Sequence, residues 1–141
     1  LFEWCAENRV PVLAHCGYTG VEPEWLRAKA EPDRFRLALQ KFPKLQLLLA
    51  HTGLSRRMET LAVARDFPKQ VWLDISGQSA PDMKTILDGF DRERICFGSD
   101  WPFYPLAVAL ARSLVATEDC PDYRDELFLK NGARFLGLAS G

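Results

Sequence analysis

The chain has 141 residues, of which 48% are hydrophobic and 26% are charged, and its net charge is −1. These values are ordinary for a soluble globular protein with one core. Basic and acidic residues are interleaved, and no apolar stretch approaches the length of a membrane span. Nothing in the composition therefore indicates a nucleic acid or a membrane as partner.

The first eight residues have a helical pattern and lack an initiator methionine, so we expect the chain to be a fragment of a longer protein. Beyond them, four short apolar runs alternate with helical patterns. The apolar runs span residues 10–14, 45–50, 71–75 and 94–98. The candidate helices span residues 34–42, 57–67, 80–90, 105–115 and 123–136, and Ser55 is a candidate N-cap of the second of them.

This alternation predicts βαβ units and therefore a parallel sheet. Three of the four runs are almost entirely apolar, as in strands that are buried on both faces. Residues 17–33 contain two glycines and two prolines, and we interpret them as a long loop on the catalytic face. No linker divides the chain, so we expect a single domain over residues 1–141.

None of the four cysteines belongs to a C-x-x-C pair, which argues against a zinc knuckle or a thioredoxin-type motif. Cys16 and Cys96 lie in or beside apolar runs. We interpret them as small buried hydrophobic residues in a reducing compartment. With no signal peptide visible, the predicted location is the cytoplasm.

Both histidines of the chain end an apolar run and are followed two residues later by glycine: His15 in Leu-Ala-His-Cys-Gly and His51 in Leu-Ala-His-Thr-Gly. The fourth run ends similarly, in Phe-Gly-Ser-Asp, where the aspartate is Asp100. Parallel strands point their carboxyl ends to one rim of a barrel, so we predict that these three side chains converge there. Imidazole and carboxylate groups bind Zn²⁺ and similar ions, which lower the pKa of bound water to about 7.

Each of these residues also has a structural interpretation, as a hydrogen-bonding histidine or a helix-capping aspartate. Their joint occurrence on one rim favours function. Asp74, inside the third run, could support the site or belong to an ion pair of the barrel interior. Arg56 could hold a substrate carboxylate or begin a solvated helix. Trp101, next to Asp100, could line a substrate pocket or simply pack.

Five segments resemble strands five to eight and the C-terminal helix of the amidohydrolase-related barrels: residues 11–17, 42–53, 71–77, 94–102 and 131–138. The last segment, Asn-Gly-Ala-Arg-Phe-Leu-Gly-Leu, is similar to that family's Asn-Ala-x-Arg-Leu-Leu-Gly-Leu. The resemblance implies an α/β fold, the C-terminal half (strands 5–8) of a parallel (β/α)8 TIM barrel, with a C-terminal helix. Such a half barrel has two open sheet edges and an uncovered apolar face, so we expect the isolated chain to self-associate.

The resemblance also implies roles for the rim residues. His15 matches a metal ligand, and Asp100 matches a residue that contacts the metal and accepts a proton from its water. His51 matches a ligand or proton-transfer group. The family's His-x-His or Glu-x-His at strand one is absent from these 141 residues, so His15 and Asp100 supply only two ligands unless His51 joins. The expected cofactor is a divalent metal ion, with zinc as the first candidate.

These observations predict a metal-dependent hydrolase that cleaves a C–O or C–N bond of a small cyclic ester or amide through metal-activated water. An alternative on the same fold is a non-oxidative decarboxylase of an aromatic or enol-type acid, in which Arg56 or Arg57 would hold the leaving carboxylate. Another is a non-catalytic barrel fragment. A doubly wound, phosphate-binding fold is disfavoured, since no glycine-rich loop follows any strand. The expected partners are a small-molecule substrate and other copies of the chain.

Overall fold

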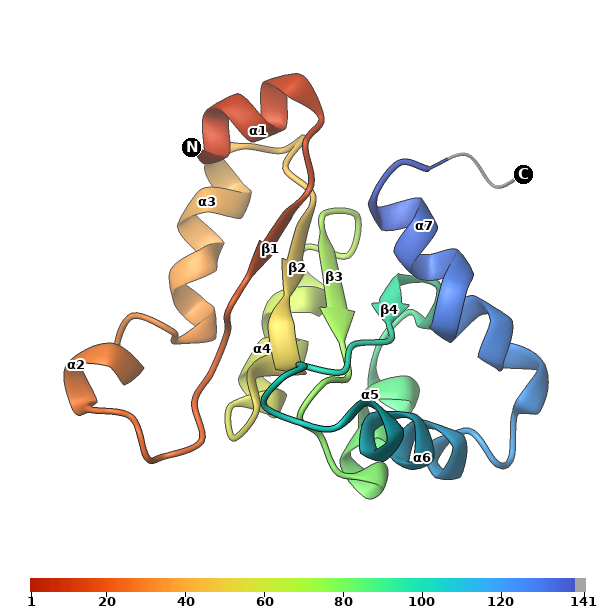
Figure 1. Ribbon diagram of the computed structural model, residues 1–141. Helices are drawn as coiled ribbons and strands as arrows, with labels where there is room; N and C mark the ends of the chain where they lie inside the picture. Colours follow the sequence, from red (N-terminus) through yellow and green to blue (C-terminus); the bar gives the residue numbers. More distant parts are fainter. Residues whose placement is uncertain (139–141) are drawn as a thin grey trace.

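A single parallel sheet organises the computed structural model, which describes residues 1–138 (Figure 1). The strands are β1 (Val12–Ala14), β2 (Leu47–Leu49), β3 (Val71–Asp74) and β4 (Ile95–Cys96). Their order in the sheet is their order in the chain, and each neighbouring pair is parallel. Each strand lies inside one of the predicted apolar runs, so the predicted parallel sheet is confirmed. Residues 139–141 of the predicted domain lie outside the described residues.

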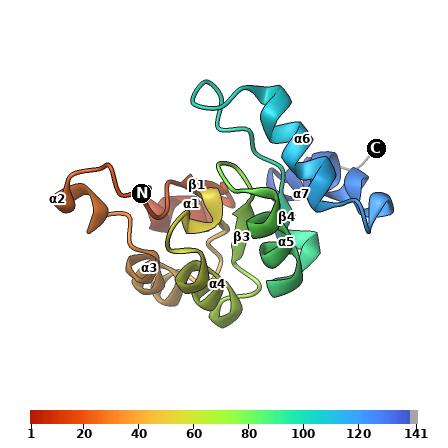
Figure 2. The same ribbon diagram turned by 90° about the horizontal axis from the view of Figure 1, so that it is seen from below.

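Three helices cover one face of the sheet, as Figure 2 shows from below. They are α3 (Phe35–Lys41), α4 (Arg57–Asp66) and α5 (Ala80–Gly89). The strand side chains on this face are apolar and fully buried: Leu47, Leu49, Val71, Leu73 and Ile95. Burial of one such side chain contributes about 1.5–3 kcal/mol. This face therefore forms the main core and holds the strand ends in place.

The opposite face of the sheet is covered only in part. Leu48 and Trp72 lie on it and pack against Phe135 of helix α7 (Asn131–Phe135), with the rings of Trp72 and Phe135 5.5 Å apart. Leu13 of β1 pairs in register with Leu48 and shares this face, but it is 64% exposed. The uncovered part of the sheet is therefore at β1, which is an edge strand.

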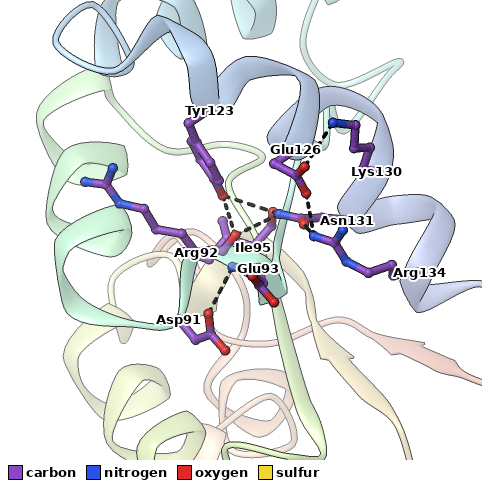
Figure 3. Close-up of polar contacts among 9 residues, drawn as sticks. All are labelled: Asp91, Arg92, Glu93, Ile95, Tyr123, Glu126, Lys130, Asn131 and Arg134. Atoms are coloured by element: carbon purple, nitrogen blue, oxygen red, sulfur yellow. Dashed lines mark hydrogen bonds and ion pairs between the residues drawn. The ribbon is translucent and has the colours of Figure 1, made fainter. Parts of the chain in front are cut away.

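The C-terminal helices close the outer edge of β4. The main-chain N–H of Phe97 donates to the carbonyl oxygen of Leu127 at 3.0 Å. The side-chain amide of Asn131 donates to the carbonyl oxygens of Ile95, at 2.6 Å, and Arg92, at 2.8 Å (Figure 3). The expectation of two open sheet edges was therefore wrong for this side. Leu127 and Asn131 occupy the groups that a neighbouring strand would use.

The rest of the described chain forms short helices. α1 (Phe2–Asn8) precedes β1, α2 (Glu24–Arg27) lies within the long connection 17–33, and α6 (Leu106–Ala116) packs on α5. Short 3-10 segments occur at Pro32–Arg34, Ala50–Gly53, Arg92–Arg94 and Pro121–Tyr123. The predicted last helix contains a π-helical segment, Glu126–Lys130, that continues into α7. Within residues 1–138, no helix is long and apolar enough to cross a membrane.

Candidate active site

Three of the predicted site residues meet at the carboxyl ends of the strands. These ends of β1 to β3 lie in the lower part of Figure 1, where the segment after β4 passes in front of them. His15, His51 and Asp100 line one hollow of about 560 Å³, and the rings of His15 and His51 are 5.1 Å apart. The other residues that line it are Thr19, Val21, Glu22, Leu26, Leu54, Phe103 and Tyr104. The long connection 17–33 therefore borders the same hollow as the histidines.

The two histidine-bearing loops are held against each other, main chain to main chain. A Cβ atom at Gly17 would lie 1.8 Å from the carbonyl oxygen of Gly53, and the φ angle of Gly17 is +77°, so this position requires glycine. The main-chain N–H and the hydroxyl of Ser55 donate to the carbonyl oxygen of Tyr18, at 3.4 and 2.6 Å. The prediction that Ser55 caps α4 was wrong, because Arg56 is the N-cap and Tyr18 accepts the hydroxyl proton of Ser55.

The backbone of His51 is held in an uncommon conformation. His51 and Thr52 have φ angles of 61° and 42°, which for residues other than glycine costs of order 1–3 kcal/mol each. Hydrogen bonds from β3 and the loop after it offset this cost. Asp74 Oδ1 accepts from the main-chain N–H of His51 at 2.9 Å, and the side-chain amide of Gln78 donates to the carbonyl oxygen of His51. Thr52 Oγ1 donates to the carbonyl oxygen of Asp74 at 2.5 Å. These bonds fix the main chain of His51, from which its ring projects.

The ring of His51 has a polar partner that the sequence did not single out. Its Nδ1 lies 2.7 Å from Ser76 Oγ, and Ser76 Oγ lies 2.6 Å from Asp74 Oδ1. Asp74 and Ser76 are buried, and no ion pair of residues 1–138 includes Asp74. Of the two interpretations of Asp74, the structure therefore favours support of the site. Ser76 could have been noticed because, like both histidines, it directly follows an apolar run, and a glycine comes after it, here at the next position.

His15 is more exposed and is anchored differently. Its Nε2 lies 3.1 Å from the carbonyl oxygen of Gly17. Because a carbonyl oxygen only accepts, this contact places the proton of a neutral ring on Nε2. The other nitrogen, Nδ1, is then the one with a free lone pair, and it is the atom through which His15 could bind a metal.

A tight turn positions Asp100. Its φ angle is 57°, and its carbonyl oxygen accepts from the main-chain N–H groups of Phe103, at 2.9 Å, and Tyr104, at 3.3 Å. Asp100 therefore does not act as a simple helix cap. None of the ion pairs within residues 1–138 involves its carboxylate. The carboxylate remains free to accept a proton or a metal at the hollow.

The two residues predicted to bind substrate do not line this hollow. Arg56 forms ion pairs with Glu31, at 3.1 Å, and with Glu59, at 2.8 Å. Trp101 is 74% exposed, and its near neighbour Phe103 lines the hollow instead. The structure thus brings His15, His51 and Asp100 together but leaves Arg56 and Trp101 apart, and their substrate role stays a prediction.

The donors at the hollow fit a divalent metal in kind but not in number. Imidazole nitrogen and carboxylate oxygen are ordinary ligands of zinc and similar ions. Within residues 1–138, however, no three His, Cys, Asp or Glu side chains are grouped closely enough to hold a metal ion. Cys16 adds no ligand at the hollow, because its side chain is fully buried and does not line it. His15 and Asp100 alone are one ligand short of a usual catalytic site.

A parallel sheet covered by its connecting helices, with imidazole and carboxylate groups at the carboxyl ends of the strands, is the architecture of a β/α-barrel enzyme. Residues 1–138 match the amidohydrolase family, and the chain belongs to this family. The predicted fold, strands 5–8 of a parallel barrel, is confirmed by this match and by the solved structures that the chain resembles. No curated protein matches the chain.

Three solved structures illustrate the likeness. A TIM-barrel protein of uncharacterised function from Bordetella bronchiseptica is 22% identical, with a TM-score of 0.76 over 96% of this chain and 48% of that one. A dihydroxybenzoic acid decarboxylase from Polaromonas sp. JS666, solved with manganese and an inhibitor, is 17% identical, with a TM-score of 0.75 over 96% and 52%. An amidohydrolase from Burkholderia multivorans, solved with zinc, is 18% identical, with a TM-score of 0.64 over 98% and 56%. The chain therefore spans about half the length of these proteins, and the likeness shows the fold alone.

Proposed function

We propose that this chain carries part of the active site of a metal-dependent hydrolase, which cleaves a C–O or C–N bond of a small cyclic ester or amide with water as the nucleophile. The observation that carries the proposal is the convergence of His15, His51 and Asp100 on one hollow. Two imidazoles and a carboxylate on a barrel rim are the groups that such a reaction needs to bind a metal and to move a proton.

His15 and Asp100 are the proposed metal ligands in this chain, His15 through Nδ1 and Asp100 through its carboxylate. A bound divalent ion supplies water that is acidic enough to be deprotonated near neutral pH. Zinc is our first candidate because it accepts mixed sets of imidazole and carboxylate ligands. The zinc in the Burkholderia structure and the manganese in the Polaromonas structure support a divalent metal of either kind. At least one further ligand must join those two.

The proton steps fall to Asp100 and His51. Asp100 has no basic partner within the described residues, so its carboxylate can accept a proton from the nucleophilic water. The ring of His51 lines the same hollow and can stabilise or protonate the leaving oxygen or nitrogen. Leu26, Leu54 and Phe103 provide an apolar wall. A hollow of about 560 Å³ lies within the usual range for small-molecule sites, which supports a small-molecule substrate.

A decarboxylase of an aromatic or enol-type acid is the second candidate. Four of the similar solved structures carry that activity in their names, one of them with 2,6-dihydroxybenzoate bound. The two arginines predicted to hold the leaving carboxylate give it little support, because Arg56 pairs with Glu31 and Glu59, and Arg57 pairs with Asp82 at 2.7 Å. Neither guanidinium lies at the hollow to hold a leaving carboxylate.

The test is an assay of the protein, loaded with zinc or manganese, against small lactones, cyclic amides and 2,6-dihydroxybenzoate. Acid release with uptake of water supports the hydrolase, and CO₂ release without uptake of water supports the decarboxylase instead. Asp100→Asn is expected to lower the rate about 10²–10⁴-fold, as for loss of a general base. The matched control is Asp122→Asn, an exposed aspartate remote from the hollow. If no metal binds and His51→Ala changes nothing, the chain is a non-catalytic fragment and the proposal fails.

We also propose that the isolated chain forms homo-oligomers through the open edge at β1, where Leu13 is 64% exposed. Unpaired strand edges bearing apolar side chains associate readily. Sedimentation velocity over a range of concentrations would reveal association, and Leu13→Lys should weaken it. Leu129→Lys is the control because that residue is 70% exposed and lies in the Glu126–Lys130 segment at the β4 side, the opposite edge of the sheet. A monomer at all concentrations would refute this proposal.

A further inference from the structure

We propose that Ser76 is a positioning residue, which fixes the proton of the neutral His51 ring on Nδ1 and leaves Nε2 as the nitrogen that exchanges protons at the hollow. The inference rests on the proposed function only in the statement that Nε2 exchanges protons with a substrate at the hollow. The assignment of the proton itself follows from three hydrogen bonds among Asp74, Ser76 and His51.

The first step concerns Asp74. Its Oδ1 accepts from the main-chain N–H of His51, at 2.9 Å, and from the main-chain N–H of Ser76, at 2.8 Å. Two N–H groups that donate to one carboxyl oxygen disfavour a proton on that oxygen, because the proton would crowd their hydrogens, and an unprotonated carboxyl oxygen can accept a third hydrogen bond. Oδ1 is therefore a pure acceptor, whatever the protonation of the rest of the carboxyl group.

The second step concerns the hydroxyl of Ser76. Its Oγ lies 2.6 Å from Asp74 Oδ1, and at this distance two oxygens without a proton between them would repel each other. The Ser76 hydroxyl therefore donates to Asp74. That hydroxyl has only one proton, so Ser76 Oγ can only accept from His51 Nδ1, which lies 2.7 Å away. The neutral His51 ring must then carry its proton on Nδ1.

The pair of Asp74 and Ser76 is closely surrounded by the rest of the protein. Asp74 is 7% exposed and Ser76 is 3% exposed. A Cβ atom at Gly98, two residues beyond β4, would lie 3.1 Å from Ser76 Cβ and 3.2 Å from Asp74 Cγ, so the backbone there passes close to the pair.

The consequence lies at Nε2 of His51. Within the described residues this nitrogen has no hydrogen-bond partner, and the residue lines the hollow with His15 and Asp100. In the neutral ring Nε2 carries a lone pair, and in the charged ring it carries a proton that it can donate. In both states the Nδ1–H bond to Ser76 is unchanged. One oxygen of Asp74 thus holds the main chain of His51 directly and its ring through Ser76. In catalytic and metal-binding histidines, too, a hydrogen bond to one ring nitrogen commonly sets the state of the other.

The tautomer can be measured by long-range ¹H–¹⁵N correlation spectra of the metal-free, ¹⁵N-labelled protein, at a pH where His51 is neutral. With only two histidines in the chain, His15→Gln assigns the signals. We expect the protonated-type nitrogen signal of His51 at Nδ1 and the unprotonated-type signal at Nε2. In Ser76→Ala we expect the proton to shift to Nε2, the form that neutral imidazole favours in water. Asp74→Asn keeps an acceptor oxygen and should retain the wild-type pattern.

The matched control is Ser79→Ala. Ser79 lies on the same connection, but its hydroxyl caps α5 and donates to Asp82 at 2.7 Å, so its loss should not change the His51 ring. A wild-type spectrum with the proton on Nε2 overturns the proposal without any variant, and so does a folded Ser76→Ala protein with an unchanged tautomer. Because no metal or substrate is present, this outcome is independent of the outcome of the activity assay.

Discussion

Asn131→Ala is expected to destabilise the fold strongly, although the residue is far from the hollow. Asn131 is fully buried, and its side-chain amide donates to the carbonyl oxygens of Ile95, at 2.6 Å, and Arg92, at 2.8 Å (Figure 3). Each hydrogen bond contributes about 1 kcal/mol net, and a buried carbonyl left without a donor costs about 1–3 kcal/mol. Arg92 keeps a second donor, the hydroxyl of Tyr123 at 2.5 Å, so only Ile95 loses its partner. The expected loss of unfolding free energy is about 2–4 kcal/mol.

Urea unfolding followed by circular dichroism at several protein concentrations would measure this loss. Lys130→Ala is the control, since Lys130 is at the surface and its solvent-screened pair with Glu126 contributes little to stability. The double variant Asn131→Ala with Tyr123→Phe removes both donors to the carbonyl oxygen of Arg92. Its loss of unfolding free energy should therefore exceed the sum of the two single losses, with a coupling energy of about 0.5–3 kcal/mol. A loss below about 0.5 kcal/mol for Asn131→Ala would show that α7 does not hold the β4 edge.

Two further predictions concern the glycine contact and the buried thiols. Gly17→Ala should cost at least about 3 kcal/mol or prevent folding, because its Cβ would lie 1.8 Å from the carbonyl oxygen of Gly53; Gly20→Ala, which also has a positive φ but no atom within 4 Å, should cost only about 1 kcal/mol. Equal melting temperatures for the two variants would contradict the close contact. Burial raises the thiol pKa of Cys16 and of Cys96 from 9.0 to about 12. The free energy of unfolding should therefore be unaffected below pH 9 and fall as the pH rises toward 12. Each thiol should lower it by up to about 1.4 kcal/mol per pH unit. In reducing buffer, we expect the urea midpoint of Cys96→Ala to fall less steeply between pH 7 and 10.5 than that of the wild-type protein. The same slope for both proteins would contradict burial of the Cys96 thiol.

Much of the fold could be predicted from the sequence because the relevant signals are local. Apolar runs separated by helical patterns define strands and helices over a few residues each, and their alternation implies a parallel sheet. The placing of His15, His51 and Asp100 at strand ends was equally local, since all carboxyl ends of such a sheet meet on one side. Four strands and the convergence of three side chains were therefore predictable without coordinates.

Contacts between segments that are far apart in the chain were decided only by the tertiary structure. The sequence shows a serine at position 76, but not that its hydroxyl lies between Asp74 and the ring of His51. It shows Asn131 as part of a family-like ending, but not that this side chain binds the free edge of a strand 36 residues earlier. It also suggested Arg56 as a substrate ligand, whereas the folded chain brings Glu31 and Glu59 to its guanidinium. Hydrogen bonds need partners within about 3 Å, and only the packing of the sheet and its helices determines which distant polar groups come that close.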